Sequence, residues 1–140
     1  MVNKIFLDIN ILIDFLDATR KEHIAAKELF EAIENKKVEA FFSESVINTT
    51  YYLIRKSVSP ATLKSLMQWL LAIIKVIPCT NEIVAEAYRN AQNDFEDAVL
   101  YQLALHNHLD YFVTSDEKDY KRIEKAATKV VSAKQLIKLI

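Results

Sequence analysis

Three acidic residues occupy positions at which parallel α/β sheets hold their ligands. Asp8 directly follows the apolar run 5–7, and Asp116 follows the apolar run 111–113 after two hydroxyl residues. Asp97 lies in the first turn of a predicted helix that precedes the second run. Because strand ends and helix N-termini of such sheets meet at the carboxyl edge, we expect the three carboxylates to converge in one crevice.

A crevice of this kind has a limited range of chemistry. Like charges repel strongly in a poorly solvated cleft, so clustered carboxylates need a proton or a cation among them. Oxygen ligands favour hard ions such as Mg²⁺ or Mn²⁺, which activate water and hold a phosphodiester for hydrolysis. Glu96 or Asp94 would lie beside Asp97. The acids therefore predict a divalent-metal site.

Each acid also has a purely structural interpretation. Asp8 on its own is more typical of a helix N-cap than of a metal ligand. Asp116 precedes a short polar helix that it would cap, and the acids within 94–97 would oppose a helix dipole. Only the coincidence of acids at equivalent strand ends favours a functional site.

The elements that would position these acids alternate between short strands and helices. Connections of this length require parallel strands and right-handed crossovers. We therefore predict a single α/β domain over residues 1–140, a three-layer α/β/α sandwich with four or five parallel strands. Strands are expected at 5–7, 38–42, 76–77, 111–113 and 129–131, and the longer helices at 20–35, 44–56, 60–74, 80–93 and 95–105.

Composition excludes several classes of protein. The chain has 18 Lys and Arg against 19 Asp and Glu, which argues against nucleic-acid binding by bulk charge alone. It contains no glycine, so it has no glycine-rich phosphate loop or dinucleotide fingerprint. With neither a signal-peptide core nor an apolar run long enough to span a bilayer, we expect a cytoplasmic protein without a membrane partner.

The other reactive side chains are interpreted as structural. His106 and His108 lie two residues apart near a helix end, so they face apart and form no zinc site. Cys79 is the single cysteine, which rules out an intramolecular disulfide. No histidine can be assigned to it, and we interpret it as a small buried residue rather than a nucleophile.

Two helical segments have side chains that could either pack in the core or bind another molecule. Tyr51, Tyr52 and Arg55 are residue types that stack on and grip single-stranded RNA. We favour the simpler interpretation, in which the tyrosines lie in the core and Arg55 is an exposed helix charge. The segment 63–74 is apolar nearly all round, so it is expected to be deeply packed or covered by a partner.

Three segments resemble the motifs of the PIN-domain family: Phe6 to Leu12, Asp94 to Ala98, and Val113 to Tyr120. The resemblance is strongest to the short bacterial members, the virulence-associated protein C-like ribonucleases of type II toxin–antitoxin modules. It implies that Asp8, Asp97 and Asp116 are catalytic and bind Mg²⁺ or Mn²⁺. The remaining roles it implies are those of Glu96 as an auxiliary acid, and of Asn10 and Thr114 as groups that orient ligands and water.

The chain departs from the family at one position. The family usually carries a further acid about six residues past the serine that corresponds to Ser43. Here Thr49 occupies that place. Either Thr49 or Asn48 would hold a metal-bound water, or Glu96 and its neighbours would supply the charge.

The resemblance implies a divalent-metal-dependent ribonuclease that acts as the toxin of a type II module. Its partners would be an RNA substrate, a second copy in a homodimer, and a small antitoxin whose peptide covers the acidic cleft. Two alternatives have other functions. One is a degenerate PIN fold that binds a partner with little or no nuclease activity, and the other is a phosphatase or phosphoacceptor domain with Asp8 as nucleophile.

Overall fold

The computed structural model describes residues 1–140 as five strands and eight helices. The strands are β1 (Asn3–Leu7), β2 (Val38–Phe42), β3 (Ile74–Val76), β4 (Tyr111–Val113) and β5 (Lys129–Val131). The helices are α1 (Ile9–Leu16), α2 (His23–Glu34), α3 (Glu44–Ile54), α4 (Pro60–Ile73), α5 (Asn81–Asn90), α6 (Phe95–His106), α7 (Glu117–Lys121) and α8 (Ala133–Leu139). No helix is long and apolar enough to cross a membrane.

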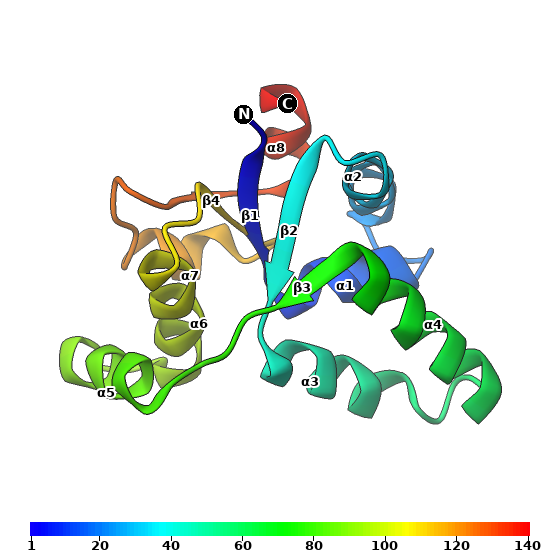
Figure 1. The fold of residues 1–140 in the computed structure, drawn as a ribbon, viewed down its shortest axis with the longest axis horizontal. Coiled ribbons are helices and arrows are strands. Elements are labelled where there is room, and N and C mark those ends of the chain that lie inside the picture. The colour runs from blue at the N-terminus through cyan, green and yellow to red at the C-terminus, as the bar shows by residue number, and fades with distance from the viewer.

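All five strands form one parallel sheet in the order β3-β2-β1-β4-β5. Helices α1 to α4 lie on one side of the sheet and α5 to α7 on the other, while α8 returns to pack on α2 (Figure 1). This arrangement confirms the predicted three-layer α/β/α architecture. The strand order reverses at β1, because β2 and β3 extend the sheet in one direction and β4 and β5 in the other.

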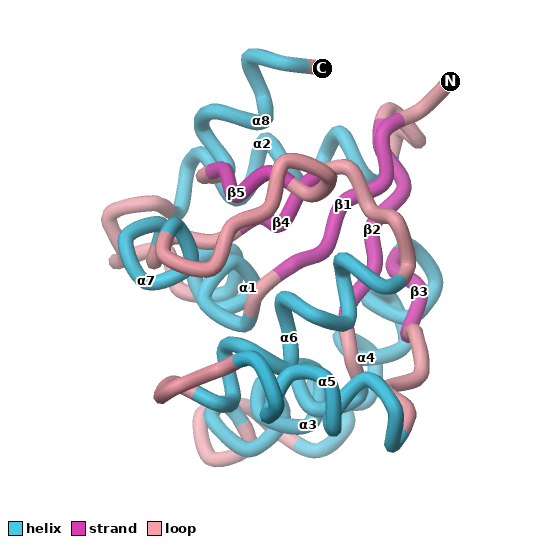
Figure 2. Tube along the Cα trace, turned by 90° about the vertical axis from the view of Figure 1, so that its left-hand side faces the viewer, coloured by secondary structure: helices cyan, strands magenta, loops and turns pink.

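The molecule has two distinct ends. Both chain termini lie at the end opposite α3 and α5 (Figure 1 and Figure 2). The strands run toward α3 and α6, so the carboxyl edge of the sheet faces those helices. Short polar residues start most of the helices at this edge: Ser43 caps α3 and Thr80 caps α5, each accepting a hydrogen bond from a backbone N–H.

Aromatic packing in the core joins the central strands to two helices. Phe6 of β1 stacks on Phe112 of β4, with 5.2 Å between the ring centroids. The Phe112 ring also contacts Tyr101 of α6 at 5.7 Å and Tyr120 of α7 at 4.3 Å. All four side chains are almost fully buried, so Phe112 fixes α6 and α7 relative to the sheet.

The predicted tyrosine packing in α3 is wrong. Tyr51 is 48% exposed and Tyr52 is 63% exposed, because the buried stripe of α3 runs through Val46 and Thr50 instead. Thr50 tolerates burial since its hydroxyl donates to the Val46 carbonyl at 2.8 Å. Arg55 is half-buried rather than free, with its guanidinium 3.9 Å from the Tyr52 ring centroid.

Two further expectations need correction. Cys79 is exposed, because it lies in the loop between β3 and α5 rather than in an element that packs on the core. The third strand begins at Ile74 rather than at residue 76, since the chain leaves α4 after Ile73 and Ile74 pairs with Ala40 of β2. An unbroken apolar run has no period that separates helix from strand. Helix α4 packs on the core through Leu63 and Leu70, whereas Leu71 on another face of the helix is half exposed.

An ion pair between a buried carboxylate and a partly exposed arginine joins α1 to the loop that follows it. Asp14 is buried, its Oδ1 accepts from Arg20 Nε at 2.6 Å, and its Oδ2 has no partner. We expect Arg20→Ala to lower the free energy of unfolding by about 1–3 kcal/mol, because it leaves a buried carboxylate unpaired. This expected loss is smaller than the loss for a fully buried ion pair, because the Arg20 side chain is 41% exposed.

Urea denaturation measures this difference, with Lys21→Ala as the matched control. Lys21 is an exposed neighbour of Arg20 that makes no ion pair within the chain, so its removal should leave the free energy of unfolding unchanged. Equal losses in the two variants would contradict a specific role for the Asp14–Arg20 pair.

Candidate active site

The strand order places Asp8 and Asp116 at one edge of the sheet. Leu7, the last residue of β1, lies beside Val113, the last residue of β4. Asp8 follows Leu7 directly, and its backbone N–H donates to the Val113 carbonyl at 3.0 Å. The Asp8 side chain also caps α1, accepting from the Ile9 backbone N–H at 2.9 Å. The interpretation of Asp8 as a helix N-cap is therefore correct. The same residue also lies at the carboxyl edge of the sheet beside Asp116, which we call the acidic edge.

Asn10 lies between the carboxylates of Asp8 and Asp116. Its Nδ2 donates to Asp8 Oδ2 at 3.0 Å and to Asp116 Oδ2 at 2.9 Å. Its Oδ1 accepts from the Ser115 backbone N–H at 3.0 Å. Because this N–H requires an acceptor, the amide oxygen must face Ser115 and the NH₂ group must face the two acids.

Thr114 connects the same two acids from the β4 side. It is fully buried, and its hydroxyl donates to Asp8 Oδ2 at 2.9 Å. The same oxygen accepts from the Asp116 backbone N–H at 3.0 Å. A hydroxyl has one proton to donate, so Thr114 donates it to Asp8 and acts only as an acceptor toward the Asp116 backbone N–H.

Asp97 reaches the site from the start of α6, where Tyr120 holds it. Asp97 is half-buried, and its Oδ1 accepts from the Tyr120 hydroxyl at 3.0 Å. Tyr120 is 1% exposed and packs against Phe112. Burial, followed by the neighbouring carboxylates, raises the pKa of Tyr120, so the phenol remains a proton donor to Asp97. The sequence motif that ends at Tyr120 does not predict this contact, because only tertiary packing brings Tyr120 to Asp97.

The carboxylates share one electrostatic environment. Burial raises the pKa of Asp8 to about 6; hydrogen bonds from Thr114 and Ile9 oppose this shift, and the charges of Asp97 and Asp116 add to it. Burial also raises the pKa of Asp97, and further acids at the start of α6 and in α7 add to that shift. None of Asp8, Asp97 and Asp116 forms an ion pair with a basic side chain of the protein.

The donor set fits a hard divalent cation. Asp97 Oδ2 and Asp116 Oδ1 accept no hydrogen bond within the protein, and Asp8 Oδ1 accepts only from the Ile9 backbone. No three His, Cys, Asp or Glu side chains lie close enough together to hold one ion as a group. Mg²⁺ commonly binds one or two carboxylates and keeps several water ligands, so two of these acids are enough.

Three other predicted site residues make no contact with this cluster. Glu96 is exposed without a hydrogen bond, and it acts on Asp97 only through its charge. Thr49 is exposed on α3 and its hydroxyl makes no hydrogen bond within the chain. Arg55 directly follows the last residue of α3, at the end of that helix away from the sheet. Its Nη1 donates to the Tyr52 carbonyl at 2.8 Å.

Comparison with known proteins identifies relatives of one kind. A family model described as PIN domain matches residues 4–118. The chain is 24% identical over 122 residues to ribonuclease VapC1 of Aquifex aeolicus, an alignment that covers 84% of each protein.

Two solved structures have a similar fold. One is VapC20 of Mycobacterium tuberculosis, a toxin that cleaves the sarcin–ricin loop, with a TM-score of 0.61 and 17% identity over 77% of this chain and 86% of that chain. The other is VapBC2 of Rickettsia felis bound to a DNA fragment from its promoter, with a TM-score of 0.66 and 15% identity over 92% and 98% of the two chains.

The raised pKa of Asp8 predicts a pH-dependent stability for the metal-free protein. The unfolded chain loses this proton near pH 3.8, whereas the folded chain holds it to about pH 6. In that window the folded state binds more protons, so its stability must fall as the pH rises. We expect Asp8 to contribute a fall of at most about 3 kcal/mol between pH 4 and pH 6.

Urea denaturation across this pH range, with a chelator present, measures the fall. Asp8→Asn removes the titrating group, so its free energy of unfolding should fall less over the same range. Wild-type and Asp8→Asn curves that run parallel from pH 4 to pH 6 would contradict the assignment.

Proposed function

The chain belongs to the PIN-domain family, and we propose that it is a divalent-metal-dependent endoribonuclease. The observation that carries this proposal is the grouping of Asp8, Asp97 and Asp116 at the carboxyl edge of the sheet, where Asn10 bridges two of them, Tyr120 holds the third and none forms an ion pair within the chain. The names of two similar proteins, a ribonuclease and a toxin that cleaves the sarcin–ricin loop, support RNA as the substrate.

We assign metal binding to Asp8, Asp97 and Asp116, with Mg²⁺ or Mn²⁺ as the ion. When bound, such an ion activates water and stabilises the charge on the phosphodiester. The hydrogen bonds of Asn10 and Thr114 occupy Asp8 Oδ2 and Asp116 Oδ2, so the oxygens left for a metal are Asp116 Oδ1 and Asp8 Oδ1, which accepts only from the Ile9 backbone. These two residues are positioning groups, comparable to the outer-shell partners that orient metal ligands in other sites.

The groups around Asp97 supply orientation and additional charge. Tyr120 keeps its proton and donates it in a hydrogen bond to Asp97 Oδ1, which leaves Oδ2 available. Glu96 is the auxiliary acid, since its charge adds to the field at Asp97. Thr49 stands where a further acid is expected, so the site carries less negative charge than it would with a carboxylate at that position.

We further propose that the protein is the toxin of a type II toxin–antitoxin module. The VapBC2 neighbour, a complex bound to its promoter DNA, supports an antitoxin partner. A basic antitoxin segment would complement the carboxylates of the site, and this chain would form a homodimer. The half-exposed apolar residues of α4 are candidates for part of a protein interface. A toxin that acts on RNA with such a partner would be a cytoplasmic protein.

RNA cleavage in the presence of Mn²⁺ tests the nuclease proposal. We expect Asp8→Asn and Asp116→Asn each to lower the rate on the order of 10²-fold or more, because each removes a charge on which metal binding depends. Glu31→Gln is the matched control, since Glu31 is exposed on α2 and makes no contact with the site. Addition of Mn²⁺ should also raise the melting temperature of the wild type more than that of Asp8→Asn.

Equal cleavage by all four proteins would refute these assignments. A wild type that neither binds Mn²⁺ at millimolar concentration nor cleaves RNA would favour the binding-module alternative instead.

Thr49→Glu tests the effect of the missing acid. A carboxylate at this position should make Mn²⁺ binding roughly tenfold tighter, because one more negative charge would act on the cation in a partly solvated site. Calorimetry measures the dissociation constant. Ser65→Glu, an exposed position on α4, adds the same charge far from the sheet edge and should change the constant little. Equal effects of the two substitutions would contradict a role for position 49.

A further inference from the structure

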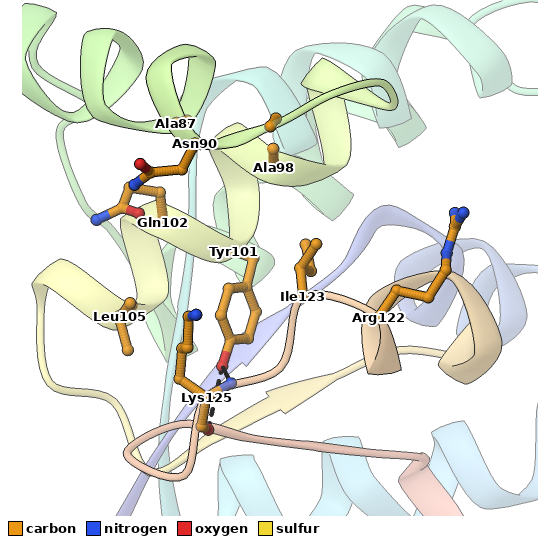
Figure 3. Close-up of a pocket in the computed structure, with 10 residues that line it drawn as sticks. Ala87, Asn90, Ala98, Tyr101, Gln102, Leu105, Arg122, Ile123 and Lys125 are labelled. Carbon is orange, nitrogen blue, oxygen red and sulfur yellow. Dashed lines mark hydrogen bonds between the residues drawn. The ribbon is translucent and has the colours of Figure 1, made fainter.

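Two adjoining hollows extend from the candidate site along α5 and α6. The first has a volume of about 300 Å³ and reaches Asp97. The second, shown in Figure 3, has a volume of about 420 Å³ and continues to Lys125. We call the combined space the α5–α6 groove, because the two hollows share five lining residues: Asn90, Ala91, Ala98, Arg122 and Ile123.

The lining of the groove changes from acidic to basic along its length. Asp94, Asp97 and Asp119 line the end next to the site. Lys125 lines the far end, and Arg122 borders both hollows. In Figure 3, Tyr101 and Ile123 lie between Arg122 and Lys125. Side chains without charge supply the rest of the far end: small and apolar Ala87, Ala98 and Leu105, and the amides of Asn90 and Gln102.

Several polar groups of the groove are free to bind a ligand. Lys125 makes no ion pair, and the Gln92 and Gln102 side chains make no hydrogen bond within the chain. Arg122 pairs with Asp94 at 2.8 Å, but the two side chains are 58% and 52% exposed. An ion pair this exposed contributes little to stability, so Arg122 can exchange Asp94 for another anion at little cost.

We propose that the α5–α6 groove binds the single-stranded RNA segment next to the scissile phosphodiester. This inference rests on the proposed ribonuclease function and adds a substrate-binding site to it. Arg122 and Lys125 contact flanking phosphates, and the amides of Gln92 and Gln102 contact base edges.

The chemistry of the groove favours single-stranded RNA over other ligands. Amide side chains both donate and accept hydrogen bonds, as the exposed edges of unpaired bases require. A small, apolar floor accepts the face of a base, and basic side chains along a groove follow a phosphate backbone. The acidic end opens beside Asp97, so a strand held by the basic end leads directly to the carboxylates.

The position of Lys125 does not depend on its own side chain. Its backbone N–H donates to the Tyr101 hydroxyl at 2.7 Å, and that hydroxyl donates to the Thr128 carbonyl at 2.6 Å. Tyr101 is buried and belongs to the aromatic cluster around Phe112. Lys125→Ala therefore removes the ammonium group and preserves the loop that carries it.

Fluorescence anisotropy with labelled single-stranded RNA tests the proposal. The probe is a pool of randomised sequence about 12 nucleotides long, within the length that one binding groove occupies, and EDTA prevents cleavage. We expect Lys125→Ala and Arg122→Gln each to weaken binding roughly three- to tenfold and to lower the salt slope by about 0.7, the value for one phosphate contact on a single strand. Lys125→Glu should weaken binding further.

Lys138→Ala is the matched control, because it removes one exposed, unpaired lysine from α8 at the opposite end of the molecule. It should leave the affinity and the salt slope unchanged. Cleavage with Mn²⁺ provides a second readout, in which the groove variants should raise KM and retain most of kcat.

The two proposals fail in different ways. Variants of Lys125 and Arg122 that bind and cleave RNA like the wild type would overturn the groove while the nuclease function stands. A different result would separate the proposals in the other direction. If the variants lose RNA binding and the wild type cleaves no RNA with Mn²⁺, the groove is supported and the nuclease function is refuted.

Discussion

Repulsion between carboxylates is the constraint around which this structure is built. The reversal of strand order at β1 brings Asp8 and Asp116 to neighbouring strand ends, and α6 adds Asp97. Neutral groups rather than cations lie between the first two, since the Asn10 amide donates to both. Such an arrangement holds negative charge in place without cancelling it. It lowers stability, as functional sites often do, and the proposed metal ion would offset that cost.

The hydrophobic core supports the site through one strand residue. Phe112 contacts Phe6 of β1, Tyr101 of α6 and Tyr120 of α7, so one ring packs against three different elements. The Tyr120 hydroxyl holds Asp97, whereas the Tyr101 hydroxyl holds the backbone of the loop that carries Lys125. Packing around a single ring therefore links the carboxylates to the α5–α6 groove, and both depend on the same rigid layer of aromatic side chains.

The fold and the placement of the main acids could be predicted because both depend on local patterns. Apolar runs that end in Asp8 and Asp116 define parallel strands, and the carboxyl edge follows from the crossover rule. The exposure of Tyr51 and Tyr52 could not be predicted, since Thr50 replaces an apolar residue in the buried stripe of α3. The Tyr120–Asp97 contact joins two elements whose relative placement only tertiary packing decides. Whether three carboxylates approach closely enough for a single ion also depends on that placement.

The central position of β1 has a consequence for the order in which the chain can fold. Its partner β2 is available from residue 38, but β4 begins only at residue 111. Half of the sheet can therefore form through contacts of short sequence separation, whereas the acidic edge needs contacts that span more than a hundred residues. Such distant contacts close slowly. During synthesis, Asp8 would thus be exposed to solvent long before Thr114 and Asp116 are made, and the hydrogen bonds of the acidic edge could form only after residue 116 has left the ribosome.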